Sequence, residues 1–152
     1  MSITLPALTS LSVTAISSLL GVGSPLGWLW TVALYAGWAK NWPDMDKLSG
    51  IDEDGNENAP GWSLEALKYI YEVRNAAANG HETLDTDASA VAAAAGDLAC
   101  ERYVLSKGKL QIEVLNNLDK VAPVGALLFA AWPNIEQATG LPVRVLAITP
   151  KK

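Results

Sequence analysis

The amino-terminal quarter of this 152-residue chain lacks charge altogether. From Ser2 to Ala39 there is no Asp, Glu, Lys, Arg or His, and the first charged residue is Lys40. A solvated protein surface normally carries charge, so this segment must be covered by the protein core, by another subunit or by lipid. The absence therefore describes the surroundings of the segment and says nothing about chemistry.

Cysteine and histidine are scarce as well. Cys100 is the single cysteine, which excludes a disulfide within the chain. His81 is the single histidine, and although it could share a metal with Asp85, no second His or Cys has suitable spacing. We interpret Cys100 as a small packing residue and His81 as a solvated loop residue. We predict no catalytic residue, no cofactor and no metal site.

Positive charge is sparse, and familiar enzyme motifs are missing. The net charge of −5 and the pI near 4.7 argue against nucleic acid as a partner, because phosphates need clustered Lys and Arg. The chain has no phosphate-binding Gly-rich loop, no dinucleotide fingerprint and no nucleophile elbow. These absences favour a protein that is not an enzyme.

The uncharged segment, residues 1–42, is predicted to form a helical hairpin. Gly21 to Pro25 would break it into arms of about residues 5–21 and 25–41. The second arm is rich in aromatic residues, which are frequent at protein interfaces and at membrane surfaces. We therefore assign an interface to its aromatic residues, namely Trp28, Trp30, Tyr35, Trp38 and Trp42. Lipid contact through residues 5–39 is the alternative.

Residues 43–61 are predicted to form a solvated acidic loop. Six carboxylates and several Gly, Asn and Pro residues lie in this stretch. The alternation from Asp52 to Asn58 is similar to a calcium loop. The match fails because Glu57 stands where that loop needs Gly and Ser63 where it needs Glu.

Residues 62–152 are predicted to form a helical body that ends in a strand. Helices are expected over about 63–79 and 85–107. Residues 110–118 fit either a strand or a helix, and we favour the helix. Residues 121–132 are expected to form a buried helix or a re-entrant segment, and Pro133 to Gly140 a short helix. The segment Leu141 to Pro150 is predicted as a strand that pairs with residues 110–115 or, through Val143 and Val145, with another subunit.

Together these features predict a mainly α protein. The favoured function is a non-enzymatic assembly subunit, such as a virion or tail component, that joins a homo- or hetero-oligomer through its apolar hairpin. The first alternative is a membrane-associated, pore-forming or ejection-type protein. The second alternative is a small enzyme whose site carries no recognisable motif. The sequence assigns no cellular location, and no cleavable signal peptide is evident.

Overall fold

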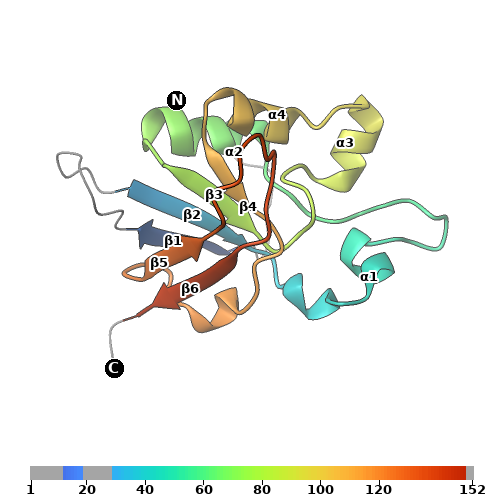
Figure 1. Ribbon diagram of the computed structural model, residues 1–152. Coiled ribbons are helices and arrows are strands. Elements are labelled where there is room, and N and C mark those ends of the chain that lie inside the picture. The colour runs from blue at the N-terminus through green and yellow to red at the C-terminus, as the bar shows by residue number, and fades with distance from the viewer. Residues whose placement is uncertain (1–11, 19–28, 150–152) are drawn as a thin grey trace, which may run out of the picture.

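The computed structural model describes residues 12–18 and 29–149, and its centre is a six-stranded mixed sheet (Figure 1). The strand order is β4-β3-β2-β1-β5-β6. The strands are β1 (Ser12–Ser18), β2 (Leu29–Tyr35), β3 (Ala78–His81), β4 (Leu110–Ile112), β5 (Leu127–Ala131) and β6 (Arg144–Ile148). The chain is therefore a mixed α/β protein, and the prediction of a mainly α fold is wrong.

Short helices accompany the sheet. They are α1 (Met45–Ser49), α2 (Leu64–Lys68), α3 (Ser89–Ala95) and α4 (Ala99–Ser106). A π-helical turn, Tyr69–Val73, continues α2, and 3-10 turns occur at Ala39–Asn41 and Leu118–Lys120. Figure 1 shows α2 and α4 together on one side of the sheet, with α3 beyond them.

The predicted helical hairpin is a β-hairpin where the structure describes it. β1 and β2 pair antiparallel from Ser12 opposite Tyr35 to Ser18 opposite Leu29. In β2, Leu34 packs on one face of the sheet and Ala33 on the other, so both faces are apolar. A strand buried on both faces loses the alternation of polar and apolar residues, and its apolar run is easily mistaken for a helix. Within the described ranges, no helix is long and apolar enough to cross a membrane.

Each face of the sheet has its own core. On the helix side, Leu34 of β2 and Leu67 of α2 pack with Tyr71 and Val104. On the opposite side, Ala33 packs with Leu115, Leu118 and Ala126 from the segment between β4 and β5. Successive residues of a strand therefore point to opposite faces of the sheet and into different surroundings.

The predicted helices of the body are shorter than expected. The helix from residue 63 ends at Val73, and the last part of the predicted range is strand β3. The helix predicted over 85–107 divides into α3 and α4, because Gly96 adopts a left-handed conformation with φ of 61° and caps α3. The acidic loop contains α1, whose first turn is capped by the side chain of Asp44.

The structure contradicts three of the four carboxyl-terminal predictions and contains a strand in the fourth segment. Residues 110–112 form β4 where we favoured a helix, and residues 127–131 form β5 where we expected a buried helix. Residues 133–140 form no helix. A strand, β6, does lie within residues 141–150, but it pairs with β5, and β4 lies at the far edge of the sheet.

Candidate active site at the carboxyl ends of β3 and β4

Three parallel strands end side by side, and the segments that follow them are bonded to one another. β2, β3 and β4 run in the same direction. The amide of Leu115 donates to the carbonyl of His81 at 2.9 Å, and the amide of Val114 donates to the carbonyl of Thr83 at 3.1 Å. Ligands commonly bind beyond the carboxyl ends of parallel strands, where successive loops converge. Functional side chains are therefore expected at this edge.

His81, the last residue of β3, is buried, so the prediction of a solvated loop histidine is wrong. Its Nδ1 lies 3.0 Å from Oγ1 of Thr83, and its Nε2 lies 3.1 Å from Oγ1 of Thr86. The Thr86 hydroxyl donates to Oε1 of Gln111 in β4 at 2.9 Å. Burial lowers the pKa of His81 to about 4, against a smaller opposing effect of the Thr83 carbonyl. At neutral pH the imidazole is therefore uncharged.

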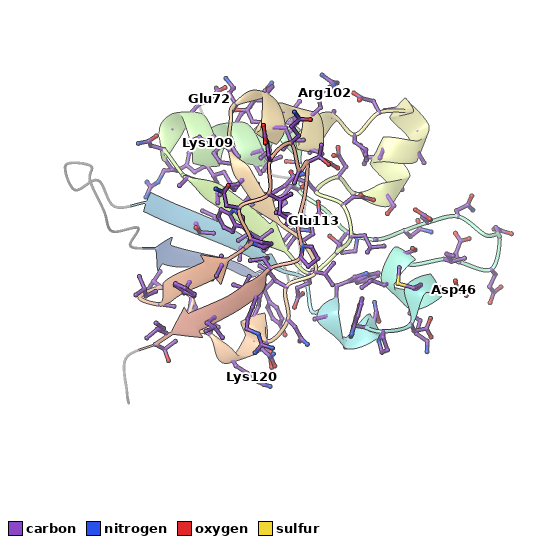
Figure 2. All side chains as sticks on the ribbon, viewed as in Figure 1. Asp46, Glu72, Arg102, Lys109, Glu113 and Lys120 are labelled. Carbon is purple, nitrogen blue, oxygen red and sulfur yellow. The ribbon has the colours of Figure 1, made fainter. Side chains whose placement is uncertain are left out.

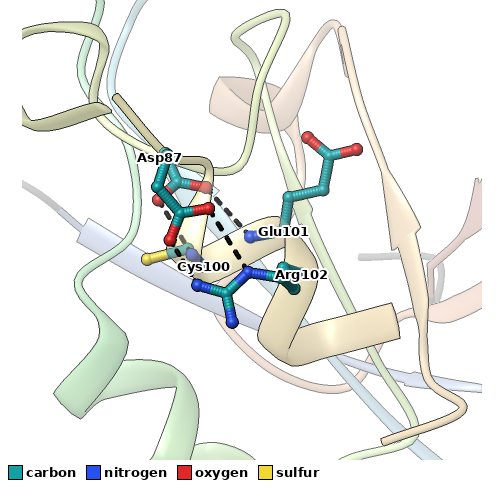
Figure 3. A network of polar contacts seen from close by, with 5 residues as sticks. Asp87, Cys100, Glu101 and Arg102 are labelled. Atoms are coloured by element: carbon teal, nitrogen blue, oxygen red, sulfur yellow. Dashed lines mark hydrogen bonds and ion pairs between the residues drawn. The ribbon is translucent and has the colours of Figure 1, made fainter. Parts of the chain in front are cut away.

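Asp87 fixes the amino end of α4 (Figure 3). One carboxylate oxygen accepts a hydrogen bond from the amide of Cys100 at 2.8 Å, and the other accepts from the amide of Glu101 at 2.9 Å. A carboxylate is favoured there because the first amides of a helix have no partner within the helix. Asp87 is itself buried, so this contact anchors both the loop after β3 and the position of Glu101.

Two carboxylates near this loop have raised pKa values. Burial, followed by the charges of Asp85 and Asp87, raises the pKa of Glu101. Glu113 stands immediately after β4, one residue beyond its end (Figure 2). Partial burial, followed by the charges of Glu101 and Asp85, raises the pKa of Glu113 to about 7. A carboxyl group with a pKa near 7 can both accept and donate a proton at neutral pH.

The remaining surroundings combine exposure and apolar surface. Glu113 is exposed to solvent, which leaves its carboxyl group accessible to a ligand. Glu101 also lines an open groove of about 840 Å³ between α3 and α4, together with Ala92, Leu98 and Leu105. Of the two carboxylates with raised pKa values, Glu101 lines this groove. Among the described residues, no three His, Cys, Asp or Glu side chains are grouped to hold a metal ion.

Cys100 is buried and has no accessible thiolate. Its thiol donates to the carbonyl of Trp62 at 3.3 Å. Burial, followed by the nearby charge of Asp87, raises the pKa of Cys100 to about 12. A thiol that stays protonated is a poor nucleophile, which agrees with its interpretation as a packing residue.

The predicted interface residues lie elsewhere, and their role stays a prediction. Trp28 is outside the described residues, and Trp30 is described only as a backbone position of β2. Tyr35 and Val145 pack against the core opposite the helices. Trp38 is half-buried, with its indole N–H donating to the carbonyl of Leu48 at 2.7 Å. Val143 is half-buried before β6, and Trp42 is exposed.

Comparison with known proteins identifies the family. Residues 10–88, just over half of the chain, match the family model Cyclase, described as "Putative cyclase". The chain belongs to the Cyclase family. The matched region of this cyclase-family chain contains β1, β2, β3 with His81 at its end, and the loop that carries Asp87.

Isatin hydrolases resemble this cyclase-family chain in sequence and in structure. Isatin hydrolase of Roseibium aggregatum is 29% identical over 120 residues, which cover 79% of this chain and 45% of that protein. The structure of isatin hydrolase A from Ralstonia solanacearum has a TM-score of 0.72 at 31% identity and covers 79% of this chain and 45% of its own. An isatin hydrolase bound to the product analogue thioisatinate has a TM-score of 0.72 at 28% identity and covers 80% and 45%. This chain therefore spans about half the length of these relatives.

These findings overturn the functional prediction. A structural virion subunit and a membrane-associated protein are both contradicted, and the third reading, an enzyme without a recognisable motif, is supported instead. Sequence reasoning missed Glu101, Gln111 and Glu113, since no motif joins them. One usable signal was present, because Gln111 and Glu113 alternate with apolar neighbours as polar residues on one face of a strand do.

Proposed function

We propose that this chain carries a hydrolytic site that opens a small cyclic amide, with isatin as the first substrate to test. The relatives named isatin hydrolase supply the substrate class, and their likeness covers about four fifths of this chain. The observation that carries the proposal is Glu113, an accessible carboxyl group with a pKa of about 7 beyond the parallel strands. Such a group suits the proton transfers of amide hydrolysis at neutral pH.

In the proposed reaction, water adds to the amide carbonyl carbon and the ring C–N bond breaks. The carboxylate of Glu113 accepts a proton from the attacking water as the new C–O bond forms. The protonated Glu113 then donates that proton to the departing ring nitrogen, which remains attached to the product as an amine. The water is consumed and Glu113 returns to its carboxylate form, so the reaction is balanced and needs no oxidant or reductant.

The neighbouring residues set the properties of Glu113 in this proposal. Partial burial, and after it the charges of Glu101 and Asp85, disfavour its ionised form and raise its pKa to about 7. Asp87 holds the amide of Glu101 and therefore positions that carboxylate. The neutral His81, bonded through Thr86 to Gln111, stiffens the wall formed by β3 and β4.

The proposal is tested by following the absorbance of isatin with the full chain between pH 5 and pH 9. We expect wild-type turnover to rise with pH through an apparent pKa near 7 and Glu113→Gln to lower kcat/KM by about 10²–10⁴-fold. Glu57→Gln, an exposed carboxylate of the acidic loop, is the matched control and should turn over isatin like the wild type. Absence of wild-type turnover, or equal rates for the wild type and Glu113→Gln, would refute the proposal.

A further inference from the structure

A second cavity lies beyond the same strand ends, on the face of the sheet opposite the helices. Its volume is about 170 Å³, and its walls include Trp42, Leu48, Glu82, Val114 and Leu115. We call it the Glu82 pocket. A cavity of about 150 Å³ can hold one benzene ring, so the Glu82 pocket has room for a single six-membered ring with a small substituent.

The alternation of strand residues separates this pocket from the carboxylates near Glu113. A Cβ atom at Gly80 would lie 2.6 Å from Cδ1 of Leu115, so Gly80 faces the side of the sheet where Leu115 packs. Glu82, two residues on, lines a cavity with the same Leu115. His81, between them, instead bonds Thr86 and, through it, Gln111. The Glu82 pocket and the Glu113 site therefore lie on different faces.

The carboxylate of Glu82 is buried, and its two oxygens differ in their hydrogen bonding. Only 2% of the residue is exposed. Its Oε2 accepts hydrogen bonds from the amides of Ala36 at 2.9 Å and Trp38 at 2.8 Å. Within the part of the chain that the structure describes, Oε1 accepts no hydrogen bond and no Lys, Arg or His forms an ion pair with Glu82. Burying a carboxylate without a positive partner is unfavourable. A cationic donor that bonds to Oε1 would therefore be stabilising.

The wall of the pocket is held in a strained conformation. Val114 has a φ of 53°, which is rare for a β-branched residue. Its amide donates to the carbonyl of Thr83, and this contact holds the segment beside the loop after β3. Residues in such conformations are concentrated at ligand sites, where the surrounding structure maintains them. Trp42, which is 55% exposed, supplies an accessible aromatic ring at the same pocket.

We propose that the Glu82 pocket binds a small organic cation, one planar ring in size, that carries an amidinium or ammonium group. An N–H of the cation donates to Oε1 of Glu82 and neutralises its charge, while Trp42 provides a cation–π contact at the opening. The apolar walls from Leu48, Val114 and Leu115 contact the ring. This inference is independent of the proposed hydrolysis, since it uses none of the groups assigned to that reaction.

The test is titration of the full chain with benzamidine, followed by isothermal calorimetry and amide chemical shifts. Benzamide, a neutral molecule of nearly the same shape, and benzoate, an anion, are the comparison ligands. We expect benzamidine to bind at least tenfold more tightly than benzamide, and benzoate not to bind. Amide shifts should move at Trp38, Glu82 and Val114. Equal binding of benzamidine and benzamide would overturn the proposal.

Glu82→Gln is the decisive variant because the glutamine carbonyl can still accept from the amides of Ala36 and Trp38. Its NH₂ group then replaces the acceptor Oε1, so benzamidine affinity should fall at least tenfold while benzamide affinity holds or rises. Glu113→Gln is the matched control on the other face and should bind benzamidine as the wild type does. Unchanged benzamidine affinity in Glu82→Gln, or loss of it in Glu113→Gln, would overturn the assignment.

Trp42→Leu keeps the test decisive if Glu82→Gln fails to fold, because Trp42 is exposed and its replacement leaves the core intact. Its benzamidine affinity should fall several-fold, and an affinity equal to that of the wild type would overturn the proposal. The isatin assay is a separate measurement. A chain that binds benzamidine but does not hydrolyse isatin refutes only the proposed function, and the reverse result refutes only the Glu82 pocket.

Discussion

The carboxylate of Asp87 accepts a hydrogen bond from the backbone amide of Cys100 at 2.8 Å and thereby joins the loop after β3 to the first turn of α4. The two residues are thirteen positions apart, and α3 lies between them in the chain. α3 contributes no buried residue, so α4 is held to the sheet by this contact together with the packing of Cys100 and Val104 in the core that includes Leu34. The contact therefore supports the fold and the placement of Glu101 at the same time.

Asp87→Ala should destabilise the protein. It leaves the amides of Cys100 and Glu101 without their acceptor in a buried setting, and we expect the free energy of unfolding to fall by about 2–4 kcal/mol. Asp87→Asn retains one carbonyl acceptor, so its free energy of unfolding should fall by less. Urea denaturation followed by circular dichroism measures both variants. A loss below about 0.5 kcal/mol for Asp87→Ala would contradict the anchoring role.

His81 should make stability depend on pH below neutrality. Its folded pKa of about 4 lies below its ordinary value of 6.5, so between these values the unfolded chain binds a proton that the folded chain does not. Its contribution to stability is therefore complete above pH 6.5 and declines as the pH falls towards 4. From pH 7 to pH 4.5, the wild type should lose about 2 kcal/mol more than His81→Gln does.

Urea denaturation of both proteins at the two pH values gives this difference directly. The comparison cancels the titration of the carboxylates, which the wild type and His81→Gln share. Parallel pH dependences in the two proteins would show that His81 is not buried in its neutral form.

Glu113 should have the opposite effect on stability. Its folded pKa of about 7 lies above the ordinary 4.5, so its contribution is complete below pH 4.5 and is lost as the pH rises through 7. Glu113→Gln should therefore be more stable than the wild type at pH 8, by about 0.5–1 kcal/mol because solvent screens an exposed group. At pH 4.5 the two should be equally stable. Glu57→Gln is the control, and the same gain in that variant would assign the effect to net charge alone.

The strands that the sequence failed to predict are those with special surroundings. β2 has apolar residues on both faces because Leu34 and Ala33 enter different cores, and no local pattern distinguishes it from a buried helix. β3 is only four residues long, and all four are buried between β2 and β4. Its pairing depends on residues 47 and 32 positions away, which local propensity does not include.

Local sequence likewise does not predict which residues come together in the candidate site. His81 lies in an acidic stretch of the sequence, which suggested a solvated loop, yet its position at the end of β3 buries it. The charge of Glu101 adds to the effect of burial on the pKa of Glu113 only because α4 packs beside β4. By contrast, the capping residues Asp44 and Ser63 act within one turn of their own helices. The capping by Ser63, which depends on nearby residues alone, was predictable from the sequence.

Gly61→Ala should be among the most destabilising single-methyl changes in the chain. A Cβ atom at Gly61 would lie 2.3 Å from both the amide nitrogen of Ala88 and the carbonyl carbon of Asp87, and backbone atoms cannot move aside cheaply. The close approach is fixed by the next residue, Trp62, whose amide donates to the carbonyl of Thr86 at 2.8 Å. We expect a loss of about 3 kcal/mol or more in the free energy of unfolding.

The matched control is Gly140→Ala, where the added methyl group meets open space and should change stability by less than about 0.5 kcal/mol. Urea denaturation of the two variants measures the difference. Because Gly61 faces the residues that lead into Asp87, Gly61→Ala should also shift the amide resonances of Cys100 and Glu101, which Gly140→Ala should leave in place. Equal stability of the two variants would show that residues 59–62 do not pack against the loop after β3.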